Sequence, residues 1–164
     1  MLDRGLQRKM TRIERIADQM QRAYAGEAWH GPSLQELLKG VDAATASQRP
    51  IPSVHNIWEL VVHIRAWISS SIRRMNGDPA NLTPAEDWPA VGETSVAAWQ
   101  RTLAELDADH QKLYQSVKVL QEPGLKERAS GQPYSVEFML YGVIEHMLYH
   151  AGQIALLKKA MASS

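Results

Sequence analysis

The sequence contains no cysteine, and this absence excludes several kinds of chemistry at once. The chain forms no disulfide, holds no metal through a thiolate and has no cysteine nucleophile. A metal site in this chain must therefore use nitrogen and oxygen ligands. Thiol chemistry would need a thiol that a substrate brings.

The sequence also lacks a long apolar run. None approaches the roughly 20 residues that cross a membrane. Residues 1–4 open a charged segment with no apolar stretch behind it, which is unlike a secretory signal. We therefore expect a cytoplasmic location and no membrane partner.

Net charge is a third feature that is missing. The 18 basic residues balance the 18 acidic ones, whereas nucleic-acid-binding proteins usually carry a basic excess on one face. One basic cluster consists of Arg4, Arg8, Lys9, Arg12 and Arg15. Neighbouring acidic residues dilute it, so we interpret it as a solvated helix face, with a partner contact as the alternative. We expect no nucleic-acid partner.

Strand signals are scarce, and helical spacing dominates the chain. Phe138 is the only phenylalanine, and no segment alternates apolar and polar residues for long. The length of 164 residues and the apolar content of 45% fit one globular domain over residues 1–164. Four tryptophans are interpreted as core or dimer-surface residues, with platforms for a substrate as the alternative: Trp58, Trp67, Trp88 and Trp99.

Apolar residues recur every three or four positions in four long stretches, which predicts four amphipathic helices. They lie at about residues 2–24, 56–76, 95–122 and 135–161, and a short helix is expected at residues 34–38. Asn56, with Glu59 three residues later, predicts an N-cap with a capping box. Residues 42–53 carry two prolines and are predicted to be a loop, and Pro123-Gly124 is predicted to end the third long helix.

The connection at residues 77–94 is long enough to return along a helix, because an extended residue spans about 3.3 Å. The second and third long helices are therefore predicted to run parallel. Four long helices with one such crossover predict an all-α four-helix bundle, with a short extra helix after the first long one.

Histidines carry the chemistry that this sequence offers. His146 and His150 are four residues apart in the last predicted helix, so both imidazoles lie on one face and can reach a common ion. The alternative is a pair of packed histidines satisfied by hydrogen bonds. His63 decides between the two, because it completes a set of three nitrogen ligands if the second helix neighbours the last. Such a set, with open positions, is typical of a catalytic site. Zinc or nickel would suit it best, and iron or manganese are further candidates.

Three more residues are candidates for the surroundings of this site. Glu59 lies four residues before His63 and either orients it or caps the helix at Asn56. His110 lies in an apolar stripe and either belongs to the core or faces the metal cavity. His30 lies in a turn and is either structural or lines the cavity mouth. No catalytic acid or base can be assigned from the sequence.

Three segments are distinctive: residues 56–64 (NIWELVVHI), residues 146–154 (HMLYHAGQI) and residues 29–34 (WHGPSL). Together they resemble the DinB/YfiT-like superfamily of metal-dependent enzymes. The resemblance implies a bundle in up-down-down-up order, with metal ligands carried onto His63, His146 and His150. It also implies a homodimer, and relatives include thiol-dependent S-transferases and a maleylpyruvate isomerase that use bacillithiol or mycothiol.

Two hypotheses of different kinds result. The first is a divalent-metal-dependent enzyme, either a hydrolase or an S-transferase that takes a low-molecular-weight thiol and a small-molecule substrate. The second is a non-catalytic homodimeric bundle with a stress-response or ligand-binding role. Metal content, stability with chelator and a screen for thiol transfer distinguish them.

Overall fold

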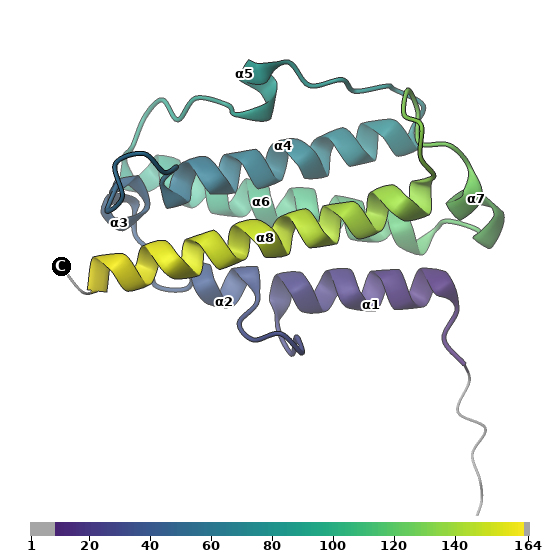
Figure 1. Ribbon diagram of the computed structural model, residues 1–164, viewed down its shortest axis with the longest axis horizontal. Coiled ribbons are helices and arrows are strands. Elements are labelled where there is room, and N and C mark those ends of the chain that lie inside the picture. The colour runs from purple at the N-terminus through teal and green to yellow at the C-terminus, as the bar shows by residue number, and fades with distance from the viewer. Residues whose placement is uncertain (1–8, 163–164) are drawn as a thin grey trace, which may run out of the picture.

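The computed structural model describes residues 9–162, and over this range the chain is helical, with loops and one isolated β-bridge between Arg128 and Ser135. The prediction of an all-α chain is confirmed (Figure 1). In chain order the helices are α1 (Arg12–Ala25), α2 (Leu34–Leu38), α3 (Ala43–Ser47), α4 (Ile57–Met75), α5 (Pro84–Asp87), α6 (Val96–Lys118), α7 (Glu122–Lys126) and α8 (Val136–Ala162).

Capping side chains decide where several of these helices begin. The predicted capping box at the start of α4 is confirmed: Asn56 accepts from the backbone N–H of Glu59, and the Glu59 carboxylate accepts from the backbone N–H of Asn56. Thr11 and Ser33 cap α1 and α2 in the same way. Each box satisfies N–H groups that have no partner inside the helix.

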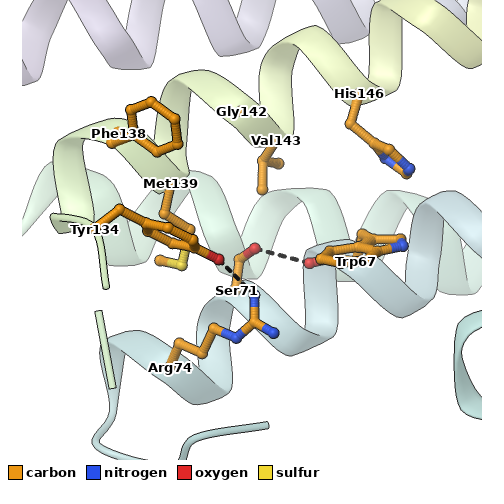
Figure 2. Close-up of a pocket in the computed structure, with 9 residues that line it drawn as sticks. All are labelled: Trp67, Ser71, Arg74, Tyr134, Phe138, Met139, Gly142, Val143 and His146. Carbon is orange, nitrogen blue, oxygen red and sulfur yellow. Dashed lines mark hydrogen bonds between the residues drawn. The ribbon is translucent and has the colours of Figure 1, made fainter. Parts of the chain in front are cut away.

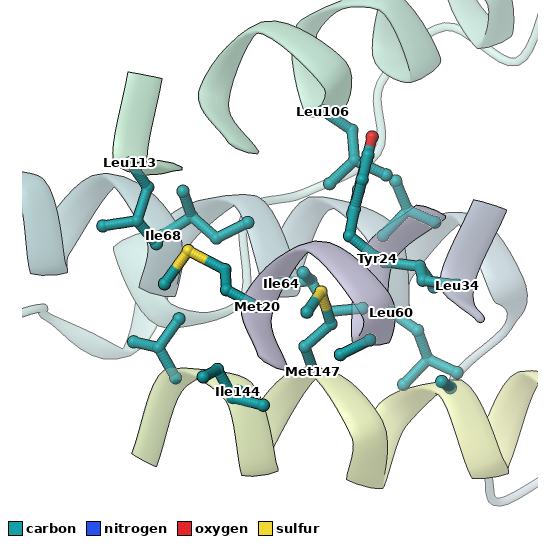
Figure 3. Packing of buried hydrophobic residues seen from close by; sticks show 14 of the residues in the cluster. Met20, Tyr24, Leu34, Leu60, Ile64, Ile68, Leu106, Leu113, Ile144 and Met147 are labelled. Carbon is teal, nitrogen blue, oxygen red and sulfur yellow. The ribbon is translucent and has the colours of Figure 1, made fainter. Parts of the chain in front are cut away.

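The four long helices pack around a common apolar core. Helix α4 packs against α6 and α8, and α1 packs against the same two helices. Figure 3 shows side chains from all four meeting there, among them Met20, Leu60, Leu113 and Met147, each at most 2% exposed. Burying one such side chain contributes about 1.5–3 kcal/mol. This packing holds α4 beside α8 and so fixes the distance between the helices that carry the candidate ligands.

The connection between α4 and α6 runs along the outside of α4. Figure 1 shows it passing over α4 and carrying the short helix α5 before it reaches the start of α6. The side chain of Arg74 and the hydroxyl of Ser70 hold its first part by hydrogen bonds to the carbonyl oxygen of Ala80. The connection therefore covers one side of α4 instead of projecting into solvent.

Three sequence predictions of local structure are wrong. The first long helix begins at Arg12, and residues 9–11 are not helical; the predicted part at residues 2–8, with Arg4 and Arg8 of the basic cluster, lies outside the described residues. Residues 42–53 contain α3, because the Asp42 side chain caps it. Pro123 does not end the third long helix, because α6 already ends at Lys118. Pro123 lies instead in the first turn of α7, where proline is tolerated because the N–H that it lacks would have no partner inside the helix.

Among residues 9–162, no helix combines the length and the apolarity that crossing a membrane requires.

Candidate metal centre

Helices α4 and α8 bring three imidazoles to one point. His63 lies in the second turn of α4, and His146 and His150 lie one turn apart in α8. The Nε2 atom of His146 is 3.0 Å from Nε2 of His63 and 3.0 Å from Nε2 of His150. One nitrogen from each ring lies within 4.8 Å of the other two. The convergence expected from the sequence is present.

Hydrogen bonds on the outer sides of two rings fix which nitrogens carry protons. Nδ1 of His63 lies 2.6 Å from the carbonyl oxygen of Asp87, and Nδ1 of His150 lies 2.7 Å from Oε1 of Gln153. These oxygens only accept, so both Nδ1 atoms carry a proton, and in the neutral form of each ring Nε2 then carries a lone pair. Nε2 of His146 can donate to only one of these two lone pairs. With neutral rings, at least one of the 3.0 Å contacts places two lone pairs against each other.

This set of donors fits a divalent metal ion. An ion at the centre would replace the unfavourable contact by bonds to three inward-facing lone pairs. Two nitrogens that are each about 2.1 Å from an ion lie about 3.0 Å apart when they subtend a right angle. Two of the three separations in the triad, those from Nε2 of His146 to Nε2 of His63 and of His150, are 3.0 Å and match this value. Three protein ligands also leave coordination positions open for water or substrate.

Burial favours the neutral form that binds metals. Burial, together with a smaller effect of the nearby rings of His150 and His63, lowers the pKa of His146 to about 3. Burial is also the main reason that the pKa of His150 is lowered, against the opposing effect of its hydrogen bond to Gln153. Since neutral imidazole is the metal-binding form, these two rings are ready to coordinate an ion at neutral pH.

Asp87, the last residue of α5, supports the triad from the long connection. Besides the backbone contact to His63, its Oδ1 lies 3.3 Å from the same Nδ1. Oδ1 also accepts a hydrogen bond of 2.7 Å from Nε1 of Trp67. Outer contacts of this kind orient metal-binding histidines and raise their basicity. Asp87 was not predicted, because a residue in an irregular connection has no periodicity that places it; its only signal is a carboxylate in a proline-flanked segment.

Trp88 covers the ring of His63. The two rings are parallel within 4°, with centroids 3.7 Å apart. The same indole stacks on His55, again at 3.7 Å. Trp88 packs against the core, as interpreted, but Trp88 and Trp67 also contact ligand histidines, which the sequence did not indicate. The aromatic rings exclude water from one side of His63.

Glu59 takes the capping role that the sequence left as one of two alternatives. Its Oε2 accepts from the backbone N–H of Asn56 at 3.0 Å and lies 3.1 Å from Nδ1 of His55. Its other carboxylate oxygen pairs with Arg49. The orienting contact to His63 comes from Asp87 instead of Glu59.

The other two candidates do not join the triad. His110 is 1% exposed and stacks on Tyr24, with ring centroids 3.7 Å apart. Burial lowers the pKa of His110 to about 4, and neither of its ring nitrogens has a hydrogen bond of normal geometry. His30 is exposed and lines a separate hollow beside Leu148 and Lys158. The core alternative for His110 is the observed one.

A cavity of about 200 Å³ lies next to the triad. Figure 2 shows that α4 and α8 form its walls, with His146 and Trp67 at one end. Phe138, Met139 and Val143 make most of its surface apolar. A small molecule in this cavity would lie within reach of the open side of the triad.

One family model, described as the DinB superfamily, matches residues 27–154. The matched range includes all three triad histidines, as well as Asp87 and Trp88. No curated protein and no solved structure matches the chain.

Proposed function

The chain belongs to the DinB superfamily, and from this premise we propose that it is a divalent-metal-dependent enzyme whose ion is held by His63, His146 and His150. The observation that carries the proposal is the convergence of three Nε2 atoms, with Nε2 of His146 3.0 Å from each of the other two. With neutral rings, two Nε2 lone pairs point inward at a third ring that can satisfy only one of them. A cation resolves this arrangement, whereas ordinary packing does not.

A bound divalent ion would lower the pKa of a coordinated water or thiol, so that the anion is available near neutral pH. The residues of the chain prepare the site for this chemistry. The Asp87 carbonyl and the Gln153 amide hold two rings in the tautomer whose Nε2 can coordinate. Trp88 shields His63 on one side, and the apolar cavity beside His146 accepts the substrate and excludes bulk water.

The proposed reaction is either hydrolysis or transfer of a low-molecular-weight thiol to an electrophilic substrate. The absence of cysteine requires that the thiol come from a cosubstrate. Three imidazoles and no carboxylate ligand favour zinc or nickel over iron or manganese.

Metal analysis of protein purified without a histidine tag tests the site. We expect about one divalent ion per chain, which His146→Ala should remove and His55→Ala should retain. His55 is the matched control, because it lies near the triad and stacks on Trp88 without providing a ligand. A content near zero in the wild-type protein, or one unchanged by His146→Ala, would falsify the site.

A screen of esters and thiol–electrophile pairs, with and without chelator, tests the enzymatic part. Activity that chelator removes and zinc or nickel restores supports the proposal. A chain that binds metal and loses stability on chelation, but turns over no ester or thiol pair, would instead be a non-catalytic bundle braced by its ion.

We also propose that the long helices form the up-down-down-up bundle that membership of the family implies. The packing of α1 and α4 against the same two helices supports it. The return of the α4–α6 connection along α4 supports a parallel α4–α6 pair (Figure 1). Spin labels at the N-terminal ends of α4 and α6 should be close together, and a long distance between them would contradict this order.

A second copy of the chain is the partner that we propose. Four large apolar side chains on one face of α8 are 40–66% exposed: Phe138, Tyr141, Tyr149 and Leu156. Exposed apolar surface of this kind is typical of protein contacts. Light scattering should show a dimer that Tyr149→Glu converts to a monomer, and a wild-type monomer would contradict the proposal.

A further inference from the structure

The cavity beside the triad contains a buried cation that has no acidic partner. Arg74, in the last turn of α4, is only 6% exposed and lines the cavity. Its three guanidinium nitrogens donate to neutral acceptors, which are the carbonyl oxygens of Pro79 and Ala80 and the hydroxyl of Tyr134. No carboxylate within residues 9–162 forms a salt bridge with it.

Other arginines on the same helix are paired differently. Arg73 pairs with Asp78, and Arg65 pairs with Asp109 and Glu105. Those two side chains are more exposed than Arg74, so the least hydrated of the three is the one without a countercharge. The C-terminal end of the α4 dipole offsets part of its charge. A buried cation still needs an anion for full compensation.

The guanidinium also has unused donors. It carries five N–H bonds, and the three hydrogen bonds to protein use one on each nitrogen. Figure 2 shows Arg74 and the Tyr134 hydroxyl meeting at the end of the cavity away from His146. The guanidinium carbon of Arg74 lies 5.6 Å from the centroid of the Trp67 ring, which lies between this end and the triad. The remaining donors and the phenolic hydroxyl can thus bind one small anion together.

The distance between the two ends sets the length of the ligand. The ring of Phe138 lies beside that of Tyr134, with centroids 5.3 Å apart. Phe138 is eight residues before His146 in α8, which corresponds to about 12 Å at 1.5 Å per residue. Apolar side chains line the cavity between its two ends. Gly142 faces the cavity without a side chain, and a Cβ atom built there meets nothing within 4 Å, which leaves the cavity accessible past α8.

We propose that this cavity binds a small carboxylic acid, with its carboxylate on Arg74 and Tyr134 and its apolar part extending past Trp67 toward the triad. This inference deepens the proposed function, on which it rests, by giving the class of substrate. A carboxylate matches one guanidinium and one hydroxyl in charge and size. A phosphate group carries nearly two negative charges, and one cation would leave it only half neutralised.

A purely structural role for Arg74 makes a different prediction. In that case its function is to hold the carbonyl oxygens of Pro79 and Ala80, and Arg74→Gln would lower stability without changing any preference between ligands. Binding of an acid compared with its neutral amide separates the two roles, because the amide has the same shape and no charge.

The experiment is calorimetric titration of the full-length protein with 3-phenylpropanoate and with 3-phenylpropanamide. The acid should bind about tenfold or more tightly than the amide, as expected for charge-assisted hydrogen bonds. Arg74→Gln should reduce this preference to about twofold or less, whereas the exposed neighbour variant Arg73→Gln, which removes the same charge, should keep it. Equal binding of acid and amide, no binding of the acid, or a preference that survives Arg74→Gln overturns the proposal.

Two further variants keep the test decisive if Arg74→Gln does not fold. Tyr134→Phe removes only the hydroxyl, and the acid preference should fall severalfold; an unchanged preference contradicts the proposal. Gly142→Leu should fill the cavity and abolish acid binding. Gly152→Leu is the matched control, because Gly152 is also a helical glycine of α8 with open space around it but lies beside a different hollow.

The same titrations on chelator-treated protein distinguish this inference from the metal proposal. An acid preference that depends on Arg74 with and without chelator supports the carboxylate site even if metal analysis finds no ion. If metal-loaded protein shows no preference for the acid, the metal-centre proposal stands and only the proposed substrate class is refuted.

Discussion

Asp87→Asn should weaken zinc binding without destroying the site. The carbonyl oxygen of residue 87, which accepts from Nδ1 of His63 at 2.6 Å, belongs to the main chain and stays in place. The substitution removes the negative charge whose Oδ1 lies 3.3 Å from that nitrogen and accepts from Trp67. His63 therefore keeps its tautomer and loses only the electrostatic part of its support.

The expected size of the effect follows from exposure and contact type. A hydrogen bond that involves a charged group contributes about 1.5–3 kcal/mol when it is buried. The Asp87 side chain is 32% exposed, so solvent screens part of this value and the low end applies. Zinc affinity should thus fall about tenfold, at the lower limit of what outer-contact substitutions do to metal sites.

Competition with a fluorescent zinc chelator measures this affinity. Glu86→Gln is the matched control, because it changes the net charge equally one residue away while its carboxylate binds Thr83 and not a ligand histidine. The control should stay within about twofold of wild type. Equal losses in both variants would show that overall charge, and not the contact to His63, determines affinity, and the reasoning would be refuted.

Zinc at about 100 times its Kd should stabilise the wild-type chain by about 2.7 kcal/mol, which a rise in Tm on addition of zinc measures. If zinc raises the Tm of His150→Ala equally, the triad is not the site. Burial lowers the pKa of His110 to about 4, so near pH 5 the unfolded chain binds a proton that the folded chain does not. The contribution of neutral, buried His110 to the free energy of unfolding is therefore fully present above a pH of about 6.5 and is lost as the pH falls toward 4. Urea midpoints between pH 7 and pH 4.5 should decline less steeply in His110→Phe, and parallel curves would refute this. Asn56→Ala should cost about 1 kcal/mol in urea unfolding because α4 loses its N-cap, whereas Asn56→Asp should cost little; equal losses would argue against the capping role.

Long periodic stretches predicted the helices well, and one contact between helices was enough to complete the triad. The apolar stripes of α4 and α8 place His63, His146 and His150 on inward faces, and packing of one helix on the other then brings them together. The spacing between His146 and His150 needs no tertiary information. The assignment of His63 as the third ligand depended on which helices are neighbours, and the sequence alone did not determine that.

Residues outside periodic segments could not be predicted in the same way. Asp87 and Trp88 reach the triad because the connection folds back along α4, and no pattern in residues 77–94 specifies that path. The short helices α3, α5 and α7 have too few residues for a period to be visible. Glu59 shows the opposite case: of the two roles that the sequence left open, the structure has the one that a local motif, the capping box, specifies.

The use of a main-chain oxygen to hold His63 has an evolutionary consequence. Replacement of the side chain at position 87 can tune the site by degrees, but only a change in the route of the backbone can erase the support. Descendants of this chain can therefore change the amino acid there at a graded cost in affinity, whereas insertions and deletions in the segment are more strongly restricted. A designer who wishes to reprogram the preferred ion would accordingly remodel the segment that carries α5 before exchanging single residues around it.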